Sequence, residues 1–338
     1  MPLVLRMLYF SLMNNIKDFI LKATKASHCE EIEDIQSLWS GYGKISRYKL
    51  TDSSFDTVIV KNIIFPNNSN NPRGWNTKNS HNRKVKSYEV ETAFYVNYNN
   101  HCGPECRTPR LLGSTNIGEE QVIVLEDLDE VGFPIRKSSL TIEQAKVCLG
   151  WLANFHATFL HTEPKGLWEV GTYWHLDTRP DEFTEMNASP LKSAASEIDK
   201  VLNNCKYQTF VHGDAKVANF CFSEDMKRVA AVDFQYVGGG CGMKDVIYLM
   251  GSCLSEDKCE QYETELLNYY FKELEKTLDK SDNKLNFNGL KEEWSFLFSI
   301  AWADFERFLM GWMPTHQKIN GYSKLKVEEA LNICKFLI

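Results

Sequence analysis

The sequence lacks a long apolar segment and an excess of basic residues. Beyond the first thirteen residues, no apolar run approaches the roughly 18 residues that a membrane-spanning helix needs. The formal net charge is −7 at pH 7, whereas broad binding to nucleic acid or to an anionic membrane requires a basic surface. These absences argue against nucleic-acid and membrane partners and favour a small molecule as the partner.

A regular cysteine framework is also missing, although the chain contains ten cysteines. A chain of 338 residues can bury an adequate core without disulfides. We therefore interpret the cysteines as the reduced, buried thiols of a cytoplasmic protein. Cys102 and Cys106 form the one close pair. A metal or redox site there would need further ligands, and no second pair with zinc-ligand spacing accompanies it.

The first thirteen residues are mostly apolar around a single charge, Arg6. They resemble the apolar region of a signal peptide, but no small-residue cleavage pattern follows. An upstream start codon read in place of Met7 or Met13 would explain the segment equally well, and it could also be part of the fold. Residues 14–25 then show the apolar spacing of an amphipathic helix.

The most informative stretch is His212-Gly-Asp-Ala-Lys-Val-Ala-Asn219, which is followed fourteen residues later by Asp233. It places Lys216 two residues and Asn219 five residues after Asp214. In phosphoryl transfer, an aspartate at the first of these positions accepts or orients the hydroxyl proton of the substrate. An asparagine and a later aspartate hold the magnesium that bridges the phosphates.

Two short apolar segments, residues 219–222 and 229–232, predict a β-hairpin between these positions. The hairpin would carry Asn219 at one end and Asp233 at the other, and so bring the two side chains together. Amide and carboxylate oxygens suit Mg²⁺. We therefore expect Asp214 to act on the acceptor hydroxyl, with Asn219 and Asp233 as magnesium ligands.

Upstream, residues 55–65 are rich in β-branched side chains and predict a central strand with one charge, Lys61. In a kinase, such a lysine contacts the ATP phosphates and pairs with a glutamate on the following helix. We expect that helix at residues 83–98, where Glu89 and Glu91 are both available. Glu91 is preferred, because the aromatic residues of the helix can then form its packing face. A lysine reaching solvent from an edge strand is the alternative.

Three further segments are candidates for nucleotide binding. Gly41 and Gly43 could form a turn over the phosphates, or an ordinary hairpin turn. The apolar strand predicted at residues 121–126 leads into a lobe-connecting hinge, where backbone groups of Glu126 and Leu128 are candidates for the adenine edge. The polar residues 66–86 predict a solvated loop, in which Arg73 and Trp75 are the alternative candidates for contact with substrate or nucleotide.

The second half of the chain reads mainly as helices. We expect His156, on the helix at residues 141–160, to be a core histidine bonded near the catalytic loop, and residues 166–183 to form a lid or an insertion.

On a later aromatic helix, Asp304 and Arg307 lie one turn apart and predict an intrahelical salt bridge. In the functional interpretation, Trp302 or Trp312 stacks on the acceptor, and Asp304 pairs with its cationic or hydroxyl group. This composition slightly favours choline, although it would also suit a sterol or a sugar.

These motifs together resemble the small-molecule kinases of the protein-kinase-like fold, which include choline and ethanolamine kinases, aminoglycoside phosphotransferases and ecdysteroid kinase-like proteins. Val211-His-Gly-Asp214 with Asn219 is similar to their catalytic loop, and Asp233-Phe-Gln235 to their metal-binding aspartate. Glu91-Thr-Ala-Phe-Tyr95 is similar to their helix motif. Two further segments resemble the ecdysteroid kinase-like branch in particular: Val124-Leu-Glu-Asp-Leu128 and Phe155-His-Ala157.

The resemblance implies an α+β, two-lobed protein-kinase-like fold. An N-lobe at residues 1–127 would hold the nucleotide on an antiparallel sheet with a helix, and a mainly helical C-lobe at residues 128–338 would carry the catalytic loop. The implied activity is that of a kinase that uses ATP and Mg²⁺ to phosphorylate a hydroxyl group of a choline-, sterol- or aminoglycoside-like alcohol. The alternative is a catalytically inactive, pseudokinase-like protein that binds a nucleotide or a metabolite.

Carried over to single positions, the resemblance implies that Asp214 is the catalytic base, that Asn219 and Asp233 bind Mg²⁺, and that Lys61 pairs with Glu91. Lys216 stands where many small-molecule kinases have a histidine, and it could contact the transferred γ-phosphate. No activation-segment signature is present, and the glycine-rich turn does not match the full protein-kinase pattern. Both departures make a protein substrate less plausible than a small molecule.

Overall fold

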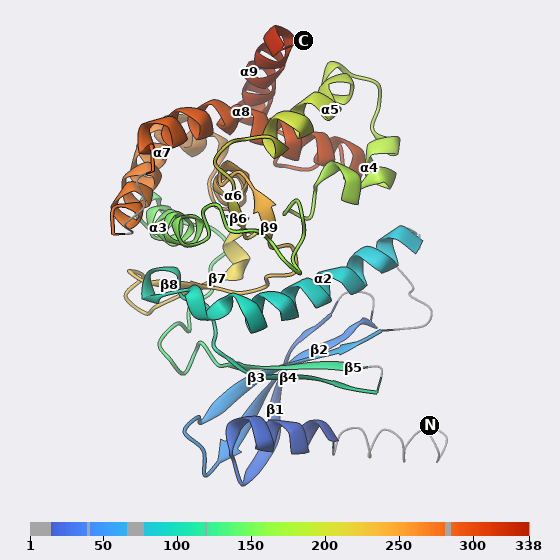
Figure 1. Cartoon of the computed structure of the whole chain (residues 1–338), viewed down its shortest axis with the longest axis vertical. Helices are drawn as coiled ribbons and strands as arrows, with labels where there is room; N and C mark the ends of the chain where they lie inside the picture. The colour runs from blue at the N-terminus through green and yellow to red at the C-terminus, as the bar shows by residue number, and fades with distance from the viewer. Residues whose placement is uncertain (1–14, 39–40, 66–77, 119, 281–284, 338) are drawn as a thin grey trace. The chain divides into compact units, whose positions relative to one another are not determined.

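A computed structural model describes residues 15–38, 41–65, 78–118, 120–280 and 285–337. The chain forms two compact units (Figure 1). Unit 1 comprises residues 1–100 with 108–134, and unit 2 comprises residues 101–107 with 135–338. The apolar N-terminal segment and residues 66–77 of the expected loop lie outside the described residues.

Unit 1 is built on a five-stranded sheet with the strand order β1-β2-β3-β5-β4, in which every neighbouring pair is antiparallel. The strands are β1 (His28–Ser37), β2 (Gly43–Thr51), β3 (Thr57–Ile64), β4 (Leu111–Ile117) and β5 (Glu120–Glu126). The strands predicted at residues 55–65 and 121–126 are thereby confirmed as β3 and β5. Both lie inside the sheet, which explains their continuous apolar sequence.

The two faces of this sheet pack against different helices. Val58 and Val60 of β3 belong to a core that includes Ile16 and Ile20 of the helix at residues 15–24. Successive side chains of a strand point to opposite faces, so Lys61 lies on the other face, where it meets helix α2 (Lys78–Asn97). Figure 1 shows the two helices on opposite sides of the sheet.

Helix α2 begins at Lys78, five residues before the predicted start, so the expectation of a loop through residue 86 is wrong for residues 78–86. These residues are polar because this end of the helix is largely half-buried or exposed. Helix formation there does not require an apolar face, since polar residues such as Lys and Arg form helices readily. His81 adds one specific contact, a 2.6 Å hydrogen bond between its Nδ1 and the Tyr42 hydroxyl.

Unit 2 is mainly helical, as expected. Its principal helices are α3 (Ile142–Thr158), α4 (Pro180–Glu185), α5 (Pro190–Asn203), α6 (Met243–Cys253), α7 (Glu256–Leu278), α8 (Phe287–Trp312) and α9 (Gly321–Leu337). Helix α3 starts with a capping box in which Thr141 and Gln144 bond to each other's backbone N–H groups. None of the described helices combines the length and apolar character needed to cross a membrane.

Four short strands in unit 2 hold the segment around residues 212–240. Strand β6 (Thr209–Val211) pairs with β9 (Gly238–Gly240), and β7 (Phe220–Phe222) pairs with β8 (Val229–Ala231), both antiparallel. The β7–β8 pair confirms the predicted hairpin. The α+β class, with an antiparallel sheet and helix followed by a mainly helical part, is also confirmed.

Candidate active site

The predicted lysine–glutamate pair is present in unit 1. Lys61 Nζ lies 2.5 Å from Glu91 Oε2, and both residues are at least 96% buried. The Lys61 ammonium also lies 5.4 Å from the ring centroid of Tyr88. Glu89, the other candidate, is exposed. The strand therefore holds an ammonium in the interior through a carboxylate from α2, instead of sending it to solvent.

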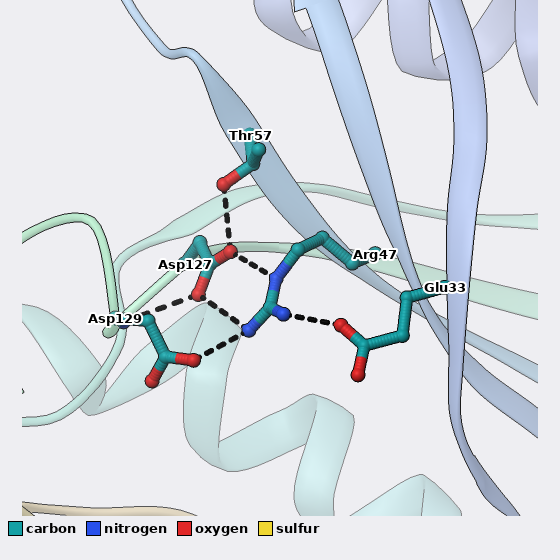
Figure 2. Close-up of polar contacts among 5 residues, drawn as sticks. All are labelled: Glu33, Arg47, Thr57, Asp127 and Asp129. Atoms are coloured by element: carbon teal, nitrogen blue, oxygen red, sulfur yellow. Dashed lines mark hydrogen bonds and ion pairs between the residues drawn. The ribbon is translucent and has the colours of Figure 1, made fainter. Parts of the chain in front are cut away.

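The segment after β5 is fastened to the sheet by Arg47 of β2 (Figure 2). Its Nε donates to Asp127 Oδ2 at 2.6 Å, and its Nη2 donates to Asp129 Oδ2 at 2.6 Å. The Thr57 hydroxyl also donates to Asp127 Oδ2 at 2.6 Å, and Glu33 accepts from Arg47 Nη1. Because Asp127 is 98% buried, this network fixes the start of the predicted hinge.

Some backbone groups next to Asp127 already form hydrogen bonds within the protein. The Glu126 N–H donates to Arg110 O at 2.9 Å, and the Leu128 carbonyl accepts from Phe133 N at 2.9 Å. The Glu126 N–H is therefore engaged within the protein, whereas the Leu128 carbonyl keeps a second lone pair. Adenine contact by backbone groups of Glu126 and Leu128 stays a prediction.

Gly41 and Gly43 close the turn between β1 and β2. Both have positive φ, 80° and 109°, and Leu38 N donates to Gly43 O at 2.8 Å. A Cβ on Gly43 would lie 2.0 Å from the Asn62 carbonyl oxygen, so this position requires glycine. The turn has hairpin geometry, and phosphate binding at Gly41 and Gly43 stays a prediction.

In unit 2, the predicted catalytic loop is held by one buried carboxylate, that of Asp245 in the first turn of α6. Its Oδ2 accepts from His212 N at 2.5 Å, and its Oδ1 accepts from Gly213 N at 3.0 Å. Its Oδ2 also lies 3.1 Å from Nε2 of His156, whose Nδ1 lies 2.7 Å from the Tyr270 hydroxyl. The prediction that His156 is a bonded core histidine near the catalytic loop is confirmed.

Sequence reasoning did not identify Asp245. The signal in the sequence was an aspartate that follows three consecutive glycines and stands within the apolar sequence of α6. In the structure this charge is fully buried. A buried carboxylate needs several donors, and here they include two backbone N–H groups of the catalytic loop.

The loop itself requires one glycine and one oriented histidine. Gly213 has φ of 78°, and a Cβ there would lie 2.0 Å from the Tyr236 carbonyl oxygen. His212 Nδ1 accepts from Asp214 N at 3.3 Å, so its Nε2 is the atom that donates to Val232 O, at 3.0 Å. The His212 ring thus links the residue before Asp233 to the backbone of Asp214.

Lys216 and Asn219 both contact the same carboxylate oxygen of Asp214. Lys216 Nζ lies 2.8 Å from Asp214 Oδ2, and Asn219 Nδ2 donates to the same oxygen at 3.1 Å. Asn219 Nδ2 also donates to the Asp214 carbonyl oxygen at 2.8 Å. The spacing of two and five residues therefore produces contact, because the short 3₁₀ helix Val217–Asn219 folds Asn219 back onto the loop.

The charges of this group depend on one another. Burial of Asp214, although opposed by Lys216, raises the pKa of its carboxyl group, and the nearby Asp233 carboxylate adds to the rise. Burial would lower the pKa of Lys216, but Asp214 and Asp233 outweigh it, so the pKa of Lys216 is raised. Lys216 therefore stays protonated and helps to keep Asp214 ionised.

Asp233 stands one residue beyond the hairpin, in a left-handed conformation with φ of 70°. Non-glycine residues adopt this region at a cost, and aspartate is among those that tolerate it best. Asn219 and Asp233 are brought together as predicted, because Val232 N donates to Asn219 O at 3.0 Å at the open end of the hairpin. Since the Asn219 amide nitrogen is engaged with Asp214, its oxygen is the atom suited to a metal ion.

Residues 166–183, the expected lid or insertion, are hydrogen-bonded to the predicted catalytic loop and to the segment after Asp233. Tyr173 N donates to Gly213 O at 3.2 Å, and Thr172 N donates to Tyr236 O at 3.1 Å. Thr172 has φ of 98°, a strained conformation for a β-branched residue. The Tyr173 hydroxyl donates to the Tyr248 hydroxyl at 3.1 Å. Burial, then Tyr173 and Asp214, raise the pKa of Tyr248 well above its usual range.

The residues predicted to contact the acceptor have structural partners. Asp304 Oδ1 accepts from Arg307 Nη2 at 2.7 Å, and Asp304 Oδ2 accepts from Trp174 Nε1 at 3.1 Å, with all three residues fully or almost fully buried. The predicted intrahelical salt bridge is confirmed. Trp302 is buried against Tyr322, and Trp312 stacks on Phe308 at 5.7 Å. Substrate contact by Asp304, Trp302 or Trp312 stays a prediction.

The ten cysteines are all free, and nine are buried. The pKa of the Cys106 thiol is lowered, chiefly by a hydrogen bond with Cys102. Among the described residues, no group of three or more His, Cys, Asp or Glu side chains could hold a metal ion. A magnesium site formed by Asn219 and Asp233 would therefore rely on phosphate and water oxygens for its other ligands, as Mg²⁺ sites commonly do.

Solved structures of small-molecule kinases show remote likeness to this chain. A choline kinase from Cryptosporidium parvum Iowa II is 11% identical, with a TM-score of 0.47 over 92% of this chain and 90% of that one. An ethanolamine kinase from Plasmodium vivax is 12% identical, with a TM-score of 0.45 over 92% and 84%. An aminoglycoside phosphotransferase from Streptomyces rimosus, solved with ADP and streptomycin, is 11% identical, with a TM-score of 0.42 over 75% and 90%.

No curated protein matches the chain significantly in sequence. The ecdysteroid kinase-like family matches it over residues 51–165 and 176–282, which is the greater part of the chain. The match includes Lys61, Glu91 and the whole segment from Asp214 to Asp233, and it omits residues 166–175. The chain therefore belongs to the ecdysteroid kinase-like family.

Proposed function

We propose that this protein is a phosphotransferase that moves the γ-phosphoryl group of ATP to a hydroxyl group of a small molecule. The observation that carries the proposal is the convergence of Lys216 and Asn219 on one oxygen of the buried Asp214 carboxylate. Lys216 stands two residues from Asp214 in a loop whose backbone requires glycine at residue 213. Its positive charge favours the ionised form of Asp214, which a proton acceptor needs.

Asp214 is the proton acceptor in this proposal. The oxygen of the acceptor hydroxyl forms a bond to the γ-phosphorus, the bond from that phosphorus to the β–γ bridging oxygen breaks, and ADP leaves. The hydroxyl proton passes to Asp214. Catalysis of this kind depends on position and charge more than on covalent chemistry, and the Asp245 network supplies the position by holding the loop backbone.

Lys216 has two roles in the proposal. At 2.8 Å from Asp214 it stabilises the carboxylate before transfer. Its ammonium carries three N–H donors, so it can also donate to an oxygen of the transferred phosphoryl group. Asn219 and Asp233 would hold Mg²⁺, which when bound neutralises phosphate charge.

Unit 1 supplies the nucleotide contacts in the proposal. Lys61 is oriented by Glu91, and its ammonium is our candidate for contact with the phosphate oxygens of ATP. The Leu128 N–H is our candidate for the adenine edge, and the turn at Gly41 and Gly43 for the phosphates. The protein would thus use ATP and Mg²⁺ with a small alcohol as its second substrate.

The decisive test is Asp214→Asn, which keeps the size of the side chain and removes its negative charge. Purified protein with MgATP and a panel of alcohols should form phosphorylated product, detected by mass spectrometry. A positioned general base contributes about 10²- to 10⁴-fold, so kcat/KM should fall by that factor. ATP affinity should change little.

Asp279→Asn is the matched control, because Asp279 is exposed at the end of α7, and it should behave as the wild type. Equal turnover by the Asp214→Asn protein would refute the proposed role of Asp214. Tight ATP binding without phosphorylated product across a broad panel would instead favour the pseudokinase-like alternative.

A further inference from the structure

Five aromatic side chains from three parts of unit 2 pack together beside Asp214. We call them the aromatic cluster: Tyr173, Trp174, Tyr248, Phe305 and Phe308. Ring centroids lie 4.9 Å apart for Trp174 and Tyr248, 5.1 Å for Tyr248 and Phe305, and 5.4 Å for Tyr173 and Phe308. Tyr173 N donates to Gly213 O at 3.2 Å, which places the cluster next to Asp214. The other four rings are at most 4% exposed, so an acceptor whose hydroxyl reaches Asp214 would meet the cluster at the half-buried Tyr173.

The faces of these rings are already covered by cations of the chain itself. Lys318 Nζ lies 4.4 Å from the ring centroid of Tyr248 and 5.3 Å from that of Phe305. Arg179 Cζ lies 5.6 Å from the ring centroid of Tyr173 and 5.3 Å from that of Phe308. A cation within about 6 Å of a ring centroid is attracted to the ring. The positions that would attract a cationic ligand are therefore taken.

The two cations differ in their polar partners. Arg179 Nη1 donates to Glu182 Oε1 at 3.0 Å, and its Nε donates to the Tyr173 carbonyl oxygen. Within the described part of the chain, no residue accepts a hydrogen bond from the Lys318 ammonium or forms an ion pair with it. Desolvation accordingly lowers the pKa of Lys318 to about 8. Such an ammonium favours a ligand that brings an oxygen with negative charge.

Lys318 is held in place by its own segment, residues 313–320, between α8 and α9. Lys318 N donates to His316 Nδ1 at 3.1 Å, and Ile319 N donates to His316 O at 2.9 Å. This segment lies outside the family match, as do residues 166–175 with Tyr173 and Trp174. Of the cluster and its lysine, only Tyr248 lies within the family match, whereas the loop from Asp214 to Asp233 lies wholly within it.

We propose that Lys318 determines acceptor specificity: its ammonium fills the cation position over Tyr248 and Phe305, so the cluster binds alcohols that carry an anionic group and rejects cationic alcohols. The proposal rests on the proposed phosphotransferase function, because it concerns the acceptor of that reaction. A cationic alcohol would meet a like charge over rings that are already occupied. An anionic group would gain the charge-assisted hydrogen bonds that the ammonium otherwise lacks.

The test is a binding experiment that requires no turnover. Its probes are three benzyl alcohols with a carboxylate, a hydroxymethyl or an aminomethyl group at the meta position, so they differ mainly in charge. The full chain is titrated at pH 7, and the indole N–H signal of Trp174 is followed by NMR. The carboxylate should bind at least about tenfold more tightly than the aminomethyl compound, a difference of about 1.4 kcal/mol.

Lys318→Met should abolish this preference and tighten binding of the aminomethyl compound, since it removes the like charge. Lys318→Arg should keep the wild-type order. Lys324→Met is the matched control, because Lys324 is exposed on α9, and it should also keep the order.

Three results would overturn the proposal: no saturable binding of the carboxylate, equal or tighter binding of the aminomethyl compound to the wild type, or an order that survives Lys318→Met. Failure of phosphoryl transfer with the predicted binding order intact would count against the proposed function alone. The experiment therefore separates acceptor selection from catalysis.

Discussion

Lys61 in unit 1 and Lys318 in unit 2 place the same functional group in similar aromatic surroundings. Lys61 Nζ lies 5.4 Å from the ring centroid of Tyr88, and Lys318 Nζ lies 4.4 Å from that of Tyr248. Lys61 also has a carboxylate at 2.5 Å, whereas Lys318 has none among the described residues. The first lysine is held by a carboxylate of the protein, and the second has N–H donors for which no described residue is the acceptor.

The comparison shows that burial alone does not define the role of a charged residue. A buried charge with a fixed partner is part of the architecture, and it can then serve as a preorganised contact. A partly buried charge without a polar partner is unfavourable in the isolated protein and points to a missing ligand. Lys216 is the intermediate case, because its carboxylate partner Asp214 is itself proposed to react.

Removing the partner of Lys61 should have the largest effect. Glu91→Ala leaves the ammonium buried without a carboxylate, and breaking a buried pair in this way costs about 3–5 kcal/mol. The double variant Lys61→Met/Glu91→Ala should recover much of this loss, since it removes the unpaired charge. Urea unfolding of the full chain measures both. Glu89→Ala, on the exposed side of the same helix, is the control, and an equal loss there would contradict the prediction.

Removing Lys216 should have an intermediate effect on the reaction. Lys216→Met should lower kcat by about 10²-fold, the typical cost of one positioned donor, with a smaller change in ATP affinity. The rate falls as pH falls through the pKa of Asp214, because protonation removes the base. Loss of the cation at 2.8 Å raises that pKa further, so the acid limb of the kcat/KM profile should move to higher pH. An unmoved limb would show that Lys216 does not act through Asp214.

Removing Lys318 should have the smallest effect, and its dependence on pH should distinguish it from Lys61. The pKa of Lys318 is about 8 in the folded chain and about 10.4 when unfolded. Between these values the unfolded state binds more protons, so this group makes the wild type more stable as pH rises. At pH 7, Lys318→Met should be at least as stable as the wild type, and the difference should shrink above pH 8.

The pH effect is measured as the difference in free energy of unfolding between Lys318→Met and the wild type at each pH. The difference is needed because other groups also titrate in this pH range. The charged and titratable neighbours Asp214, Lys216 and Cys253 are present in both proteins. Parallel pH profiles for the two proteins would show that Lys318 keeps an ordinary pKa.

The sequence predicted the placement of several candidate site residues well, because their chemistry fixes residue types at short spacings. The hairpin before Asp233 and the choice of Glu91 over Glu89 follow from local periodicity and one motif. The contacts of Lys216 and Asn219 with Asp214 were not predicted. The surroundings of Asp245 and Lys318 arise only from the packing of segments that are distant in the sequence. No spacing along the chain places Lys318 over Tyr248.

Two elements were missed for different reasons. Strand β1 carries charges at Glu30, Glu31, Glu33 and Asp34, which is unusual for a strand. Several of these charges pair across the sheet, as Asp34 does with Lys44 at 2.8 Å. Helix α5 did have signals, with Ser189 as its N-cap, Pro190 at its first turn and apolar residues spaced by three or four. That helix could have been predicted.

The hydrogen bonds that join residues 171–173 to the catalytic loop run between main-chain atoms. Gly171 N bonds to Gly239 O, Thr172 N to Tyr236 O, and Tyr173 N to Gly213 O. Main-chain bonds do not depend on side-chain identity, so substitutions at Tyr173 or Trp174 can change what the acceptor meets while the loop keeps its geometry. Gly171 is the exception, because a Cβ there would lie 2.5 Å from Val211 Cγ2. The side chains of residues 173 and 174 can therefore vary without loss of the main-chain bonds that hold the loop.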